Sequence, residues 1–167
     1  MSYTKKSLVI MQSAAAAGFN STRKTLQKLR KLHPRKIDDV VHELHNMEFS
    51  KIDCLECANC CKTTSPAIYE SDLRRMASAL KMKTIDFIDS FLSKDEEDDY
   101  IFRKTPCPFL AHDNYCAIYE SRPKACREYP HTDRKRFYQI LELTAKNSRV
   151  CPAVFNIIGQ FKKNMPA

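Results

Sequence analysis

The stretch CLECANCC, residues 54–61, holds four of the eight cysteines in this chain of 167 residues. The remaining four follow singly, at Cys107, Cys116, Cys126 and Cys151. Thiols spaced like Cys54, Cys57 and Cys60 can turn toward one metal, because the backbone between them loops around the ion and donates amides to sulfur. The adjacent Cys60 and Cys61 point apart, which favours ligands of two different sites, or one ligand and one packed thiol. The spacing therefore predicts metal binding, with the eight thiols in two groups of four.

Other uses of the cysteines explain the pattern less well. Four disulfides would need an oxidising compartment, and cysteines crowded into one short stretch make the required pairing geometry difficult. Eight unrelated buried thiols would not cluster in this way, and no single thiol is marked as a catalytic nucleophile. Because thiols survive in reducing compartments, we expect the cysteines to be reduced or bound to metal and the protein to be cytoplasmic.

The spacing also bears on which metal is bound. Zinc prefers two C-x2-C elements per site, whereas this chain has one such stretch followed by single cysteines. Three local cysteines with a remote Cys-Pro are typical of [4Fe–4S] proteins, and both Cys107-Pro108 and Cys151-Pro152 offer a fourth ligand. The pattern therefore favours an iron–sulfur cluster, with zinc as the alternative. The nearby cations Arg122, Lys124 and Arg127 could offset the negative charge of the thiolates.

Helical signals dominate the rest of the chain. Apolar residues at helical spacing predict helices over residues 22–32, 37–47, 71–80, 84–92, 137–146 and 153–163. Ser21 or Thr22 and Ser71 are the expected caps of the first and third of these. The acidic run 95–99 is expected to be a solvated loop, residues 100–102 are short strand material, and residues 109–119 predict a small hairpin. The expected fold class is mainly α, a small cysteine-rich metal-bound domain with several short helices and a minor β-hairpin.

Composition excludes several classes of protein. The chain has only two glycines and neither a GxGxxG nor a GxxxxGKS motif, so the usual nucleotide-binding motifs are absent. No run of about 18 apolar residues exists, which argues against a membrane span. His42 and His45 are three residues apart, so they do not form the HExxH zinc motif, and a surface or capping role is expected for them.

The positive charge is concentrated at the N-terminus. Residues 1–36 hold nine lysines and arginines and no acid, whereas residues 37–167 hold 19 basic and 20 acidic side chains. We therefore expect a basic, helical extension over residues 1–36 and a cysteine-cluster metal-binding domain over residues 37–167. The extension could contact nucleic acid or an anionic surface, but a solvated helix is the simpler expectation. The first twenty residues also mimic a signal or transit peptide, although the thiols favour a protein that is not exported.

Several short motifs in a fixed order carry a resemblance to a known family. They are C-x2-C-x2-C-C at residues 54–61, P-C-P-F-L at 106–110, C-x-I-Y-x2-R-P-x2-C-R-x-Y-P at 116–130, and Cys151-Pro152. In this order they resemble the YkgJ-type cysteine-cluster (CxxCxxCC) family, described as a zinc- or iron-chelating domain. The resemblance covers roughly residues 37–160 and includes all eight cysteines. A larger relative with the same cysteine pattern is the flagellin lysine N-methylase.

Two functional hypotheses follow for a chain of this kind. In the first, the protein holds iron–sulfur cluster(s) or zinc through its eight cysteines, and its physiological role and any protein partner are open. In the second, the metal belongs to an enzyme, either a redox enzyme or one that modifies a protein side chain, as the methylase relative implies. The sequence carries no nucleotide or methyl-donor motif, which favours the first hypothesis.

Overall fold

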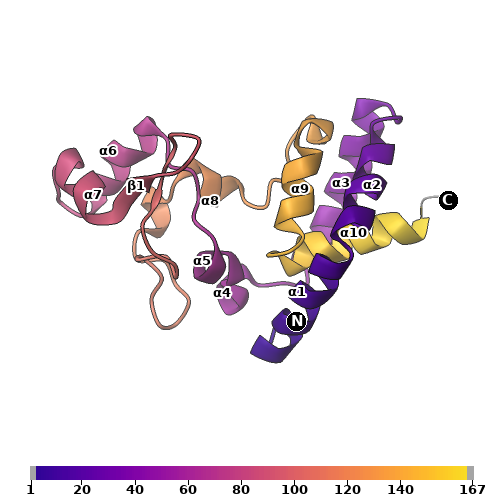
Figure 1. Ribbon diagram of the computed structural model, residues 1–167, viewed down its shortest axis with the longest axis horizontal. Helices are drawn as coiled ribbons and strands as arrows, with labels where there is room; N and C mark the ends of the chain where they lie inside the picture. Colours follow the sequence, from indigo (N-terminus) through magenta and orange to yellow (C-terminus); the bar gives the residue numbers. More distant parts are fainter. Residues whose placement is uncertain (1–2, 165–167) are drawn as a thin grey trace. The chain divides into compact units, whose positions relative to one another are not determined.

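We obtained the structure as a computed structural model, which describes residues 3–164. The chain is mainly helical and contains one two-stranded antiparallel sheet, which confirms the predicted fold class (Figure 1). Its internal contacts divide it into two compact units. The first unit takes in the described residues up to Cys57 and those from Pro130 onward, and the second unit is Ala58–Tyr129.

The first unit is a group of helices from both ends of the chain. Its elements are α1 (Lys5–Ala17), α2 (Phe19–Leu29), α3 (Pro34–Phe49), α4 (Cys54–Cys57), the 3-10 helix η2 (Phe137–Ile140), α9 (Leu141–Asn147) and α10 (Pro152–Asn164). Helix α2 packs against α9, and α10 packs against α3. The core that they share contains Leu26, Leu29, Ile37, Val41, Leu44, Phe137, Leu141, Ala145, Val154, Ile157, Ile158 and Phe161. The inward face predicted for the last helix is therefore confirmed.

Helix α3 shows how local sequence sets these helices. Pro34 occupies the first turn, where no backbone donor is needed, and the His33 ring accepts a hydrogen bond from the Arg35 amide. The inward residues Ile37 and Val41 are spaced at one helical turn. Two other residues of the predicted apolar set, Val40 and Met47, are 39% and 44% exposed, so the inward face is narrower than the sequence predicts.

The second unit is smaller and contains the sheet. Its elements are α5 (Asn59–Thr63), α6 (Glu70–Ala79), α7 (Thr84–Phe91), β1 (Leu92–Lys94), β2 (Tyr100–Phe102), the 3-10 helix η1 (Tyr119–Ser121) and α8 (Lys124–Glu128). Helices α6 and α7 pack against each other beside β1 (Figure 1). Their separate core contains Ile68, Leu73, Met76, Ala77, Phe87, Leu92, Phe102, Phe109 and Ile118.

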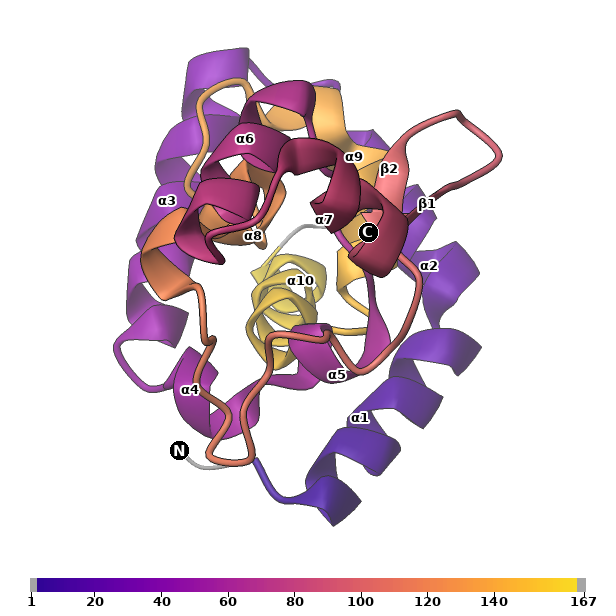
Figure 2. The ribbon, with the colours of Figure 1, turned by 90° about the vertical axis from the view of Figure 1, so that its left-hand side faces the viewer.

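The hairpin lies elsewhere than expected. Strands β1 and β2 flank the acidic run 95–99, which forms the solvated loop that was predicted and which projects away from the helices of this unit (Figure 2). The loop closes because Asp95 accepts hydrogen bonds from the Glu97 and Asp99 amides, while Leu92 and Phe102 are buried opposite each other. The expected strands over residues 109–119 make only one bridge, Leu110 to Cys116. Most of the backbone hydrogen bonds made by residues 109–119 close turns, so the segment does not form a regular β-ladder.

Two helix starts and one inward residue also differ from the predictions. Helix α2 begins at Phe19, so Thr22 lies inside it and is buried instead of capping it. Helix α6 begins one residue before Ser71, because the Asp72 carboxylate accepts the Tyr69 amide and caps this end. In α7 the fully buried residue is Phe87, whereas Ile85 is 59% exposed.

The N-terminal segment contains helices α1 and α2. Met11 and Ala15 of α1 and Leu26 of α2 are buried. The expected domain boundary after residue 36, which rests on charge, stays a prediction. Among the described residues, no helix is both long enough and apolar enough to cross a bilayer.

Candidate metal centre

Four cysteines of the second unit come from four separate segments. They are Cys61 on α5, Cys107 in the loop after β2, Cys116 at the bridge to Leu110, and Cys126 on α8. The backbone joins two of these segments directly, because the Cys107 amide donates a 2.8 Å hydrogen bond to the Cys61 carbonyl. The Ala117 amide likewise donates to the Phe109 carbonyl at 2.8 Å, which ties the turn after Cys107 to the segment of Cys116. We call these four residues the four-thiol group.

The pKa values show that these thiols lie within electrostatic reach of one another. Burial, as the largest cause, and the charges of Cys61, Cys107 and Cys116 together raise the pKa of Cys126 to about 12. Burial likewise raises the pKa of Cys107 to about 11, with Cys61 and Cys116 adding to the shift. The pKa of Cys116 is also raised, chiefly by burial and also by Cys61. Thiols gathered in this way resist ionising together unless a cation compensates them.

Cys61 is the exception in this group. A hydrogen bond from the neighbouring Cys60 thiol, helped by the charges of Arg122 and Lys62 and opposed by burial, lowers the pKa of Cys61 to about 7. Cys61 is therefore the member that most readily becomes a thiolate, and thiolate is the form that binds metal. Cys60 lies on the same short helix and contacts Cys61, which differs from the expectation that the two side chains point apart.

Backbone amides are directed at two sulfurs of the four-thiol group. Cys107 accepts hydrogen bonds from the amides of Phe109 and Leu110, and Cys116 accepts one from Ile118. Amides of the following residues that point at a cysteine sulfur stabilise the thiolate. They also orient it, as the hydrogen-bonding partners of metal ligands do. Both loops are thus shaped around sulfur, not merely around the apolar core.

The first unit holds a second, smaller set of thiols. Cys151 precedes α10 and its sulfur accepts the amides of Ala153 and Val154. Burial raises its pKa to about 12, and the charges of Cys54 and Cys57 contribute to the same shift. Helix α4, which carries Cys54 and Cys57, begins where Asp53 accepts the Leu55 amide at 2.8 Å. We call Cys54, Cys57 and Cys151 the three-thiol group.

The structure therefore divides most of the predicted ligands, all of them among the described residues, between two groups, but their side chains do not converge on one point as the ligands of a bound ion do. All eight cysteines are free of disulfides, and each predicted Cys-Pro pair lies with a different set of thiols. Within residues 3–164, no three Cys, His, Asp or Glu side chains already converge as the ligands of one ion do. The assignment of all eight cysteines as metal ligands accordingly stays a prediction.

The two histidines have structural partners. His45 Nδ1 lies 2.7 Å from Thr132 Oγ1, and the His45 ring stacks on Phe49 with centroids 4.4 Å apart. His42 Nε2 lies 3.0 Å from the Arg134 carbonyl oxygen. These contacts hold the His42 and His45 rings against other residues of the first unit, and the expectation that neither is a ligand stays a prediction.

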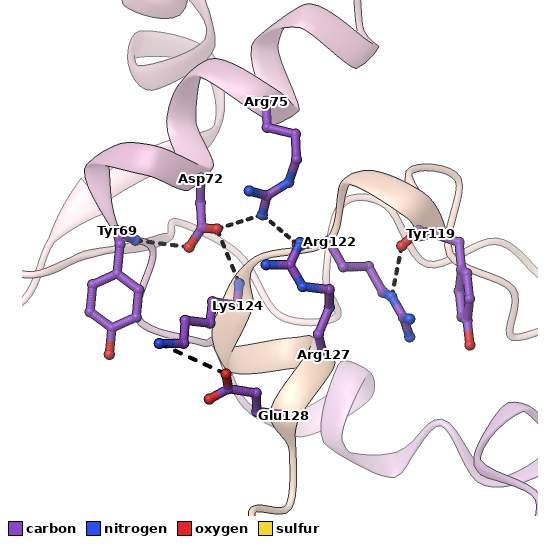
Figure 3. Close-up of polar contacts among 8 residues, drawn as sticks. All are labelled: Tyr69, Asp72, Arg75, Tyr119, Arg122, Lys124, Arg127 and Glu128. Atoms are coloured by element: carbon purple, nitrogen blue, oxygen red, sulfur yellow. Dashed lines mark hydrogen bonds and ion pairs between the residues drawn. The ribbon is translucent and has the colours of Figure 1, made fainter.

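A buried carboxylate that the sequence does not mark holds α8 in place (Figure 3). Asp72 is fully buried on α6, and its Oδ1 accepts the Lys124 amide at 3.1 Å at the start of α8. Arg75 pairs with Asp72 and also donates to the Arg122 carbonyl at 2.8 Å. Since α8 carries Cys126, these bonds fix the position of one thiol of the four-thiol group. The sequence does not predict this role for Asp72, because a single Asp in an amphipathic helix is usually exposed. Its burial here depends on tertiary contacts.

The cations predicted to lie near the thiols have defined places. Arg122 lies 3.4 Å from the centroid of the Tyr119 ring and donates to the Tyr119 carbonyl at 2.7 Å. Its charge lowers the pKa values of Cys61, Cys116 and Cys126. Arg127 donates to the Arg122 carbonyl at 3.2 Å, and Lys124 pairs with Glu128 at 3.8 Å (Figure 3). Of the three cations predicted to lie near the thiols, Arg122 is thus the one whose charge acts on them.

A helical chain whose thiols gather in sets, with backbone amides turned toward sulfur, defines a cysteine-cluster protein. The chain belongs to the CxxCxxCC family, described as a "putative zinc- or iron-chelating domain", whose family model matches residues 53–152. This range contains all eight cysteines and supports metal binding. Neither the curated proteins nor the solved structures include one that matches the chain.

Proposed function

We propose that the protein binds metal through its cysteines and that the four-thiol group of the second unit is its principal centre. The observation that carries this proposal is the gathering of Cys61, Cys107, Cys116 and Cys126 from four segments of one unit. Four thiolates are a complete ligand set for a structural zinc ion or for a [4Fe–4S] cluster. The donor chemistry fits either group, since the surrounding amides and Arg122 stabilise thiolate.

The three-thiol group of the first unit is proposed as a second centre. The charges of Cys54 and Cys57 on α4 act on Cys151 before α10, and the Ala153 and Val154 amides reach the Cys151 sulfur. This arrangement supplies three thiolates, with water or another donor completing the coordination.

For the bound metal we propose an iron–sulfur cluster, with zinc as the second candidate. The support is the combination of closely spaced cysteines with remote Cys-Pro ligands, one Cys-Pro in each group of thiols. A cluster would supply electron transfer or a structural link, whereas zinc would supply a structural link without redox chemistry.

The proposal is tested by anaerobic purification with analysis of iron, zinc and acid-labile sulfide, together with a visible absorption spectrum. Iron and sulfide in equal amounts, with broad sulfur-to-iron absorption, support the cluster, and zinc without colour supports the alternative. Cys126→Ser should lower the metal content, whereas the surface variant Lys28→Ala should not. Metal-free protein whose eight thiols all react in the native state would refute metal binding.

We also propose that the protein works in a reducing compartment, the cytoplasm. The support is that none of the eight cysteines forms a disulfide and that metal binding needs thiolates. Alkylation of thiols in intact cells, followed by mass spectrometry, tests this. Native disulfides among these cysteines would contradict it.

A further inference from the structure

The first unit carries a concentrated set of cations that metal binding does not use. Seven lie in two segments far apart in the sequence: Arg30, Lys31, Arg35, Lys36, Arg134, Lys135 and Arg136. All seven are exposed, and within residues 3–164 none of them forms an ion pair with a carboxylate. Segments 30–39 and 133–139 together hold these seven cations and three acids, a net charge of +4.

Side chains of α3 hold these two segments together by hydrogen bonds. Asp38 of α3 accepts the Arg136 amide at 2.7 Å and the Phe137 amide at 2.9 Å. His42, one turn later, contacts the Arg134 carbonyl at 3.0 Å. Asp38, an acid beside these cations, is therefore occupied in holding backbone amides. The cations of residues 134–136 are held beside α3, where the N-terminal basic segment ends.

A hollow lies between the two basic segments. Its volume is about 710 Å³, and it is lined by Arg30, Leu32, Pro34, Ile37, Tyr138 and Gln139. Tyr138 is half-buried, so part of its ring is accessible. The Gln139 side-chain oxygen accepts a hydrogen bond from Arg134 at 3.4 Å, which holds one of the seven cations against a residue that lines the hollow. Of the seven cations listed above, Arg30 lines this hollow, and the other six lie on the two segments that border it. We call the hollow, with these seven cations, the basic hollow.

We propose that the basic hollow binds single-stranded nucleic acid. Cations around a groove attract the phosphate backbone, and an accessible aromatic ring stacks on an unpaired base. A recessed apolar lining with an aromatic wall suits a base that enters the hollow. A membrane surface would instead favour apolar side chains that project from a convex face. This site is separate from the thiol groups, and its failure would leave the proposed metal binding intact.

The test measures binding of the full-length, metal-loaded protein to a fluorescent oligouridylate of about 12 nucleotides. Fluorescence anisotropy over a range of salt concentrations gives the affinity and its salt slope. The triple variant Arg30→Gln, Arg35→Gln, Lys135→Gln removes three exposed cations and should reduce the slope of log K against log salt by about 2. Tyr138→Leu keeps an apolar side chain but loses the ring, and should weaken binding about tenfold.

A matched variant separates this hollow from general attraction to the basic N-terminus. Lys5→Gln, Lys6→Gln, Lys24→Gln removes the same charge from exposed positions in α1 and α2. It should change the affinity and the salt slope less than the first triple variant does, because none of these three lysines lines the hollow. Equal losses in the two triple variants would overturn the proposal. So would equally tight binding to duplex DNA or to phosphatidylserine vesicles, because neither requires a base in the hollow.

Discussion

The chemistry of single residues separates the adjacent Cys60 and Cys61. Cys61 belongs to the four-thiol group, because its charge raises the pKa values of Cys107, Cys116 and Cys126. Cys60 acts on Cys61 itself, by a hydrogen bond that lowers the pKa of the Cys61 thiol. We therefore expect the two neighbours to have different roles toward a metal bound in the second unit.

We expect Cys61→Ser to destroy this centre and Cys60→Ser to leave it able to bind metal. Mutating a residue that only hydrogen-bonds to a metal ligand weakens metal binding by up to about 100-fold. Removing the ligand Cys61 itself should weaken it by more than that. Cys60→Ser keeps four thiolates, which already complete a tetrahedral site. Competition with a chelator measures both affinities, and Co²⁺ substitution reports the number of thiolate ligands. Equal losses in the two variants would show that the thiols of the second unit are sorted differently.

The stability of the folded chain should depend on pH through His45, independently of the thiols. Burial lowers the pKa of His45 below the ordinary histidine value of 6.5, and the charge of Asp133 opposes this shift. The unfolded chain therefore takes up a proton at higher pH than the folded chain does. Stability should be fully present above the unfolded pKa and should fall as the pH drops through 6.5 toward the lower, folded pKa.

His45→Gln should flatten this part of the stability curve. Urea unfolding between about pH 8 and about pH 5 measures the effect, which amounts to the uptake of less than one proton. The exposed His112→Gln is the control and should keep the wild-type pH dependence. An unchanged acid-side slope in His45→Gln would show that other groups carry it.

At the scale of elements, the positions of the longer helices follow from apolar spacing, and those of the thiol segments do not. Helix α10 buries the residues that its period predicts, because thirteen residues give the pattern room to repeat. The segments at residues 54–63 and 105–129 have no such period, and their places depend on hydrogen bonds between distant residues. The Lys124 amide, for example, needs Asp72 from another helix.

The hairpin shows the same limit. Residues 92–102 and residues 109–119 both have apolar residues around a polar turn, so the sequence pattern alone does not show which of them forms the hairpin. The hairpin forms at residues 92–102 because the paired residues Leu92 and Phe102 are both buried in the core of the second unit. Cys116 is held at its bridge by the turn that directs amides at sulfur. The sequence thus predicts that the cysteines bind metal, while their sorting depends on tertiary contacts.

Helix α8 should depend on Asp72. Asp72→Asn keeps the shape but loses the charge that binds Arg75 and caps α8, at a cost of about 2 kcal/mol in the free energy of unfolding. Because Cys126 lies on α8, metal affinity should fall with it, and the Co²⁺ spectrum should change. Asp89→Asn, an exposed carboxylate of α7, is the matched control and should alter neither. An unaltered spectrum and affinity in Asp72→Asn would show that α8 is positioned without this carboxylate.

At the scale of the whole chain, each unit has its own apolar core, and both cores consist mostly of residues other than cysteine. The cluster of α2, α3, α9 and α10 excludes water without the three-thiol group, although Cys151 packs against it. The core of α6, α7 and the hairpin is likewise built from aromatic and aliphatic side chains, with Cys107 and Cys116 at its edge. Metal is therefore expected to order the thiol segments and not to create these cores.

Removing the metal under reducing conditions should accordingly unfold part of the chain and spare the rest. Structural zinc in small domains contributes on the order of 10 kcal/mol, as much as the whole net stability of a typical domain, about 5–15 kcal/mol. After chelation, amides of residues 105–129 should exchange rapidly with solvent and the near-UV spectrum should weaken, whereas α3, α6 and α10 should keep protected amides and much of the far-UV signal. Hydrogen exchange with mass spectrometry measures this segment by segment. Uniform protection before and after chelation, at an unchanged melting temperature, would show that the cysteines serve something other than the fold.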